Sequence, residues 1–141
     1  MTTIDFYTHC ADRFDVVSKL IAKAWAHHGS VRVLTDSEMS TVELGRFLWL
    51  WPATGFFPHC RLASPLAAET PILVDHALEH QGPAAVLINL HADPPPFFAR
   101  FERLAEIVGT GEDDAAAARE RWKFYKARGY EMRSHNLTGR V

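Results

Sequence analysis

The sequence predicts an α/β protein: a single three-layer α/β/α domain over residues 1–141, with a mostly parallel central sheet. Three observations support this class. Short segments rich in β-branched and aromatic residues alternate with longer segments whose apolar residues recur at helical spacing. Two strand-like segments, residues 71–75 and 84–90, are continuously apolar, as in strands covered on both faces. The length of 141 residues, 48% of them hydrophobic, suits one domain with its own core.

The first expected strand, residues 4–8, is followed by a helix with clear signals at both ends. Asp12 can cap the start of this helix, and Gly29 follows its expected last residue, His28. The apolar positions repeat at i, i+3, i+4 and i+7, which predicts one buried stripe. Its members are Val17, Leu20, Ile21 and Ala24.

A second strand is expected at residues 31–35, and a second helix follows it. Either Asp36 or Ser37 can cap this helix, and Pro52 ends it. The predicted buried stripe consists of Leu44, Phe47, Leu48 and Trp51.

The second half of the chain continues the alternation. The prolines at 94–96 lead into a helix, because proline is tolerated in a first turn. The acidic residues 112–114 suit the positive N-terminal end of a last helix. In chain order we expect a long connection (52–70), two strands (71–75 and 84–90), a helix carrying Phe97, Phe101 and Leu104, a brief strand (107–108), a helix (112–128) ended by Gly129, and a polar tail.

Charge is distributed unevenly along the chain. Residues 1–118 carry eight Lys/Arg against fifteen Asp/Glu, a balance of −7, whereas residues 119–141 carry seven against two, a balance of +5. An acidic body repels a phosphate backbone, which disfavours broad binding to duplex DNA. The compact basic end better suits a small anionic ligand or an acidic peptide.

The remaining composition excludes several classes of protein. Only two cysteines are present, Cys10 and Cys60, and they are far apart, so neither a disulfide scaffold nor a cysteine zinc site is expected. The longest apolar runs fall short of the roughly 18 residues that a membrane span requires. Asp5 and Asp12 interrupt any signal peptide. We therefore expect a soluble, cytoplasmic protein that does not contact a membrane.

The predicted fold class often binds nucleotides, but the loops that hold phosphates are missing. Residues 8–12, directly after the first expected strand, contain no glycine that would let the backbone approach a phosphate. No G-x-x-x-x-G-K-[ST] motif occurs anywhere in the chain. The prediction is therefore a Rossmann-like sheet without a phosphate-binding loop and without a cofactor.

Two further patterns could carry chemistry. Asp36 and Asp93 follow expected strands, where an α/β enzyme places acids, although capping of a helix is the commoner role at such positions. A helical metal-binding face is disfavoured, because barely one turn of helix precedes the next turn signal and no third ligand is near. Its members would be His76 and His80, with Asp75 and Glu79.

The last expected helix carries a basic stripe. Arg119, Trp122, Lys123 and Lys126 lie at i, i+3, i+4 and i+7, within an arc of about 100°. This stripe is either a solvated face with the indole partly buried beneath lysine stems, or a pocket for a ligand with an apolar ring and carboxylates. In the second interpretation Trp122 and Val108 pack on the ring.

A second cluster is aromatic. Two tryptophans and three phenylalanines occur within residues 47–57, more than one helix stripe can bury. This surplus leaves Trp49 and Phe56 available for the surface, where aromatic side chains often anchor a protein interface. A small separate core under the long connection explains the same pattern equally well.

Three segments resemble a known family. They are Asp5-Phe-Tyr7, Leu48-Trp49-x-x-Pro52-x-x-x-Phe56-Phe57-Pro58-His59, and Ala118-Arg-Glu-Arg-Trp-Lys-Phe-Tyr-Lys-Ala-Arg-Gly129-Tyr130. The chain resembles the chi subunit of bacterial DNA polymerase III, and the order of the expected elements extends the match over nearly the whole chain. The resemblance implies a non-enzymatic accessory protein of the clamp loader, with an α/β fold that lacks a phosphate loop.

The resemblance also implies two partners and their sites. The acidic C-terminal tail of single-stranded DNA-binding protein is expected on Arg119, Trp122 and Lys123, with Val108 beside them. Ala115 stands where a basic residue is expected one turn earlier, and Lys126 is placed to supply that charge. The psi subunit, where it is present, is expected on Trp49, Pro52 and Phe56.

The sequence thus predicts an adaptor that reaches DNA only indirectly, by linking single-stranded DNA-binding protein to the polymerase holoenzyme. An alternative is a small enzyme that handles a nucleotide or an acid with Asp36 and Asp93. A third interpretation, direct binding to DNA, is disfavoured by the acidic body of the chain.

Overall fold

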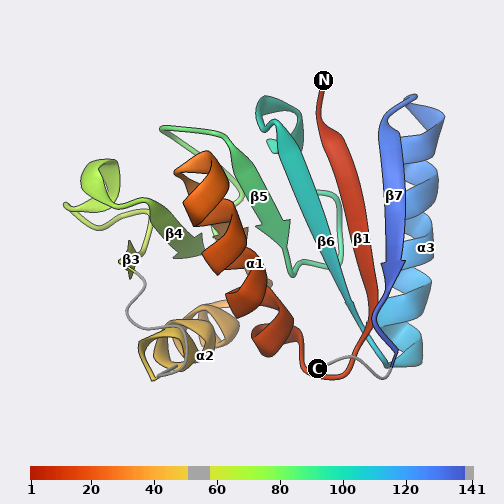
Figure 1. Ribbon diagram of the computed structural model, residues 1–141, viewed down its shortest axis with the longest axis horizontal. Helices are drawn as coiled ribbons and strands as arrows, with labels where there is room; N and C mark the ends of the chain where they lie inside the picture. Colours follow the sequence, from red (N-terminus) through yellow and green to blue (C-terminus); the bar gives the residue numbers. More distant parts are fainter. Residues whose placement is uncertain (51–57, 139–141) are drawn as a thin grey trace.

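A computed structural model describes residues 1–50 and 58–138, and within them seven strands form one parallel sheet (Figure 1). The strand order is β3-β4-β2-β5-β6-β1-β7, and every pair of neighbours is parallel. The strands are β1 (Thr3–Cys10), β2 (Val31–Leu34), β3 (His59–Cys60), β4 (Ile72–Asp75), β5 (Val86–Asn89), β6 (Arg103–Gly109) and β7 (Glu131–Asn136). The helices are α1 (Arg13–His28), α2 (Glu38–Trp49) and α3 (Glu112–Ala127), with 3-10 turns at Ala67–Glu69 and Phe98–Arg100.

The helices lie on both faces of the sheet, which confirms the three-layer prediction. Figure 1 shows α1 and α2 in front of the sheet and α3 behind β1 and β7. The face of β1 and β7 that is turned away from α3 has no helix over it in this view. The front of the sheet is therefore covered unevenly by its helices.

The helix ends follow the local signals in the sequence. The Asp12 side chain accepts a hydrogen bond from the backbone N–H of Asp15, and Gly29 ends α1 in the left-handed conformation at φ 83°. Ser37, and not Asp36, caps α2. This helix ends at Trp49, ahead of Pro52, which lies outside the described residues together with Trp51.

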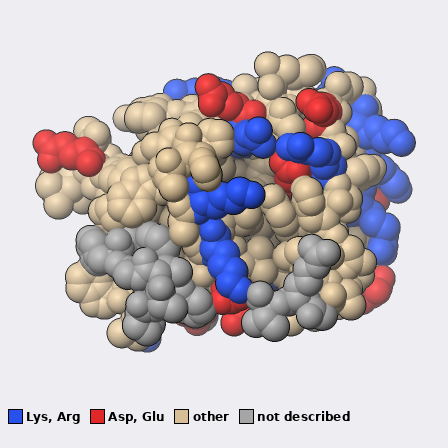
Figure 2. Space-filling view, viewed as in Figure 1, with Lys and Arg blue, Asp and Glu red and all other residues tan. Residues whose placement is uncertain are grey.

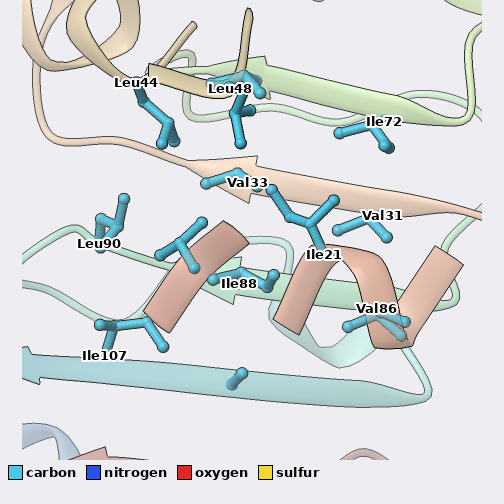
Figure 3. Close-up of a cluster of buried hydrophobic side chains, with 14 of the residues drawn as sticks. Ile21, Val31, Val33, Leu44, Leu48, Ile72, Val86, Ile88, Leu90 and Ile107 are labelled. Atoms are coloured by element: carbon cyan, nitrogen blue, oxygen red, sulfur yellow. The ribbon is translucent and has the colours of Figure 1, made fainter. Parts of the chain in front are cut away.

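Two buried clusters, one on each face, hold the layers together. In front, Ile21 of α1 and Leu44 and Leu48 of α2 meet side chains of the central strands (Figure 3). Behind, α3 packs with Tyr125 and Ala118 on a second cluster. That second cluster contains Ile4, Phe6, Leu34, Leu87, Phe97, Phe98, Phe101, Leu104 and Val108.

The prediction of a helix carrying Phe97, Phe101 and Leu104 is wrong. The chain makes one 3-10 turn at Phe98–Arg100 and then becomes extended at Phe101 (φ −94°, ψ 150°). The Oγ1 of Thr2 donates to the carbonyl oxygen of Phe101 at 2.6 Å. Leu104 belongs to β6, a seven-residue strand between β5 and β1 where only residues 107–108 were expected. One turn suffices to bury the phenylalanines, and the residues that follow join the sheet as β6.

The polar tail expected after Gly129 is also wrong, since it contains β7. This strand pairs with β1 over six residues and forms an edge of the sheet. Its polar sequence hid it, because edge strands carry charges on the face that meets solvent. Two of its polar side chains, those of Arg133 and His135, contact Asp5 on the neighbouring strand.

Candidate partner-binding surfaces

α3 is attached to the sheet by a buried polar network as well as by apolar packing. Glu106 of β6 is fully buried, and its Oε1 accepts from Arg121 Nε at 2.9 Å and from Asn89 Nδ2 at 2.8 Å. Its Oε2 accepts from the hydroxyl of Tyr125 at 2.5 Å. Arg121 also donates to the carbonyl oxygen of Ala92 at 2.8 Å. Each carboxylate oxygen has a donor, so the network fixes the helix on the sheet.

The network also changes the acid–base properties of its members. Burial raises the pKa of Glu106, while Arg121 and the hydrogen bonds oppose that effect. Burial and the neighbouring Glu106 raise the pKa of Tyr125, so its hydroxyl remains a donor. This buried network was not among the expected sites, although Ala118, Arg121 and Tyr125 recur at helical spacing on the side of α3 away from Arg119.

The opposite side of α3 presents cations to solvent, as the basic stripe predicted. The side chains of Arg119 and Lys123 are 61% and 73% exposed, and Lys126 is exposed as well. Arg119 Nη2 lies 3.3 Å from Glu112 Oε1, and Lys123 Nζ lies 3.5 Å from Glu120 Oε1. Ion pairs this exposed contribute little, so an incoming carboxylate can replace either acid at low cost.

Trp122 lies between these cations but does not project freely from the helix. It is half-buried and meets the ring of Phe6 edge-on, with 5.1 Å between the ring centroids. Val108 is only 4% exposed and belongs to the core beneath α3. The structure therefore brings Trp122 to the stripe together with the cations, and places Val108 under the surface. Ala115 is half-buried in the same helix.

The second predicted surface begins at the end of α2. Trp49 is 67% exposed and its neighbour Leu50 is 66% exposed, so this part of the aromatic cluster lies on the surface. Met39 and Val42, on the same helix, are also exposed. Pro52 and Phe56, the other residues expected here, lie outside the described residues. α2 and α3 cover opposite faces of the sheet, so the two candidate surfaces are separate (Figure 1).

The acids proposed for catalysis are exposed, whereas the buried acid at a strand end has a structural role. Asp36 and Asp93 follow the adjacent strands β2 and β5 and are both exposed. Asp75, at the end of β4, is buried and accepts from Arg61 Nε at 3.2 Å and from the backbone N–H of Leu62 at 3.0 Å. Burial acts to raise the pKa of Asp75, but these bonds outweigh it and lower the pKa.

The histidines considered as metal ligands serve different partners. Nδ1 of His76 lies 3.7 Å from Glu38, whereas His80 is turned inward onto Arg32. Across residues 1–50 and 58–138, no three His, Cys, Asp or Glu side chains gather in a way that could hold a metal ion. In the same residues, no helix combines the length and the apolar character needed to cross a bilayer.

Arg32 is a buried cation that is satisfied by backbone carbonyls. Its Nη1 donates to Glu79 O at 2.8 Å and its Nη2 to Ala77 O at 2.8 Å, and burial lowers its pKa to about 10. His80 Nε2 lies 2.8 Å from Pro83 O, so this nitrogen must carry the proton, and Nδ1 can accept from Arg32 Nη1 at 3.3 Å. Burial lowers the pKa of His80 as well.

Comparison with known proteins relates these surfaces to a family. Residues 1–133 match the family model described as "DNA polymerase III chi subunit, HolC". The chain is 32% identical to the DNA polymerase III subunit chi of Pseudomonas aeruginosa, covering 97% of this chain and 98% of that protein. It is 24% identical to the subunit of the same name from Haemophilus influenzae, over 87% of this chain and 86% of that protein. The chain therefore belongs to the family of DNA polymerase III chi subunits, with an accessory role in DNA replication.

Proposed function

We propose that this chain is a non-enzymatic, cytoplasmic adaptor of the DNA polymerase III holoenzyme. On one surface it binds the acidic C-terminal tail of single-stranded DNA-binding protein. On another it binds the psi subunit of the clamp loader. The observation that carries the proposal is the exposed row of Arg119, Lys123 and Lys126 around a half-buried Trp122, on a helix fixed from behind.

The chemistry of the α3 surface suits an acidic peptide that ends in an aromatic residue. Arg119 can form two parallel hydrogen bonds with a carboxylate, which a lysine cannot. The exposed part of Trp122 offers an apolar wall for the peptide's ring, and Phe6 holds that indole in place from beneath. The contacts are few and exposed to water, so we expect a dissociation constant in the micromolar range, about −8 kcal/mol.

The surface proposed for psi centres on Trp49. Trp49 is 67% exposed and Leu50 beside it is 66% exposed, and adjacent exposed apolar residues of this size are typical of protein interfaces. Pro52 and Phe56 belong to this proposed surface by the family resemblance. Because α2 and α3 lie on opposite faces of the sheet, both partners can bind at once.

The absence of enzymatic activity is part of the proposal. Two buried acids, Asp75 at the end of β4 and Glu106 within β6, already have donors within the protein. Asp36 and Asp93 are exposed. An adaptor of this kind should not turn over nucleoside triphosphates when the purified chain is assayed. If the purified chain had a nucleotide-dependent activity and Asp36→Asn or Asp93→Asn abolished it, the protein would be an enzyme and the adaptor proposal would be rejected.

The direct test is a calorimetric titration of the full chain with a peptide ending in several aspartates, a proline and a phenylalanine. Arg119→Ala should weaken binding by roughly 1.5–3 kcal/mol, because a hydrogen bond between charged groups is removed. Lys19→Ala is the matched control, since Lys19 is also an exposed helix cation that pairs with a neighbouring acid, Asp15, at 3.0 Å. Equal affinities of the peptide for the wild type and for Arg119→Ala would exclude α3 as the binding site of the tail.

A further inference from the structure

A groove lies on the face of the sheet opposite α3, outside both surfaces described above. It has a volume of about 450 Å³, within the size range of small-ligand sites. Its floor comes from β1, β5 and β6, and its wall comes from the second half of α1. The residues that matter for its chemistry are Asp5, Tyr7, Lys23 and Arg103.

Two cations face this groove from different elements. Lys23 extends from α1 and Arg103 from the start of β6, and both are exposed. Within the described part of the chain, neither has a carboxylate within 4.0 Å, unlike Lys19, Arg119 and Lys123. Figure 2 shows Lys and Arg side chains gathering across the middle of this face, with most of the carboxylates towards its rim.

The one acid in the groove is already neutralised. Asp5 is 7% exposed, and its Oδ1 lies 3.0 Å from Arg133 Nε and 2.9 Å from His135 Nε2. A carboxylate held this closely repels an incoming anion weakly. It also fixes Arg133 and His135 over the open face of β1 and β7.

Tyr7 lines the groove farther along β1 and stacks on His135 of the neighbouring strand. The rings of Tyr7 and His135 are stacked, 4.8 Å apart and 16° from parallel, on neighbouring strands. Burial, together with Asp5, raises the pKa of Tyr7, so its hydroxyl stays protonated and can donate a hydrogen bond. Arg103 is level with Thr3, four residues before Tyr7, which separates the cation from the aromatic pair by ~13 Å along the strands.

We propose that this groove binds nucleotide units of single-stranded nucleic acid. Phosphates lie at Lys23 and Arg103, and a base packs against the Tyr7–His135 pair. Cations in a row followed by aromatic rings on an open sheet face are how proteins hold single strands, since every base has a face that stacks. A duplex keeps its bases stacked inside, so its bases cannot pack against the aromatic pair.

The proposal departs from the expectation drawn from the net charge of the chain. The excess of carboxylates excludes broad binding only if those carboxylates lie near the contact, because exposed charges beyond about 10 Å are largely screened. Here the local charges decide: two cations without acidic partners against one neutralised acid. This site does not depend on the tail surface of α3, so either proposal can fail alone.

The test is the fluorescence anisotropy of a labelled oligothymidine of about 16 nucleotides, titrated with the full chain at low salt. The double variant Lys23→Glu/Arg103→Glu should weaken binding at least about tenfold and flatten the salt dependence, by ~0.7 in the log–log slope for each phosphate that the protein no longer neutralises. The control Arg119→Glu/Lys126→Glu changes the net charge equally on the opposite face and should leave the affinity within about twofold. Melting temperatures verify that each variant is folded.

The aromatic pair is tested without changing charge. Tyr7→Leu should weaken binding at least about fivefold, the effect expected when one base can no longer stack. His135→Ala serves the same purpose if Tyr7→Leu does not fold. If thymidine monophosphate displaces the bound oligomer, the groove recognises a nucleotide and a free nucleotide suffices as its ligand. If it does not displace the oligomer, the groove requires a strand.

Three results would overturn the proposal. The first is no anisotropy change with the wild type at about 100 μM, the weak end of non-specific binding. The second is an equal loss for the α1/β6 and α3 charge reversals, which would mean unspecific attraction. The third is displacement of the oligomer by an aspartate-rich peptide together with unchanged binding by both Tyr7→Leu and His135→Ala, which would make the groove a peptide site.

Discussion

Arg121 and Glu106 form an ion pair that is closed to solvent on both sides. Arg121 Nε lies 2.9 Å from Glu106 Oε1, and the two side chains are 5% and 0% exposed. The pair joins the middle of α3 to the strand beneath it. The side of α3 that carries Arg119 and Lys123 therefore keeps its position through a contact on its other side.

Loss of one partner should destabilise the protein strongly. Arg121→Met leaves Glu106 buried with a charge and without its cation, so we expect the free energy of unfolding to fall by about 3–5 kcal/mol in urea denaturation. Glu106→Leu/Arg121→Met should recover much of this stability, because it removes both charges. Arg119→Met, the same change on the exposed side, should stay within about 0.5 kcal/mol. A small effect of Arg121→Met would show that the pair contributes little.

Trp122 should affect both stability and binding, and two substitutions separate the effects. Trp122→Ala removes a half-buried ring from Phe6 and should lower the free energy of unfolding by about 2 kcal/mol as well as weaken binding of the acidic peptide. Trp122→Phe keeps a ring and should recover most of both. Calorimetric titration at a temperature well below both melting points measures the binding. Full affinity in Trp122→Ala would exclude the indole from the tail site.

Trp49 should behave in the opposite way. Trp49 is 67% exposed, so Trp49→Ala should change the melting temperature little while weakening a complex with psi by ~2 kcal/mol or more. Affinity for the acidic peptide should not change, because the two surfaces share no contacts. Pull-down and titration with purified psi check the first expectation. A drop of many degrees in melting temperature would assign Trp49 to the fold.

His80 should make stability depend on pH. Burial lowers the pKa of His80 in the folded protein, so below pH ~6.5 the unfolded chain takes up a proton that the folded one resists. The free energy of unfolding should therefore decrease as pH falls below ~6.5 and level off below the folded pKa. Urea denaturation at about pH 7.5 and about pH 5.5 measures this change. His80→Gln should reduce it, and an unchanged pH dependence in that variant would exclude His80 as its source.

The parts of the fold that could be predicted are those that local residues decide. α1 carries a cap at Asp12, a stop at Gly29 and one apolar stripe, and the structure has each of them. The helix expected at residues 97–104 failed because the carbonyl oxygen of Phe101 bonds to Thr2, nearly a hundred residues earlier. The prediction of a polar tail after Gly129 was wrong for a similar reason, because this segment contains β7. Its polar residues make a strand only because β1 supplies the backbone partners.

The features of the candidate site likewise divide into those that local residues decide and those that depend on distant residues. Helical spacing alone places Arg119, Lys123 and Lys126 on an exposed side of α3. The partial burial of Trp122 depends on Phe6, from the first strand, and no spacing within the helix reveals that. The buried pair of Glu106 and Arg121 is equally non-local, since it joins residues of a strand and a helix whose packing the sequence leaves open.

The position of β1 in the sheet sets the order in which the chain can fold during synthesis. β1 precedes the other six strands of this sheet in the chain, yet both of its neighbours, β6 and β7, come after all the others. The backbone groups of β1 therefore have no strand partners until β6 has been synthesised, while β2, β4 and β5 can already pair. Until then a nascent chain should present an unpaired strand edge, which is the situation in which chaperones bind.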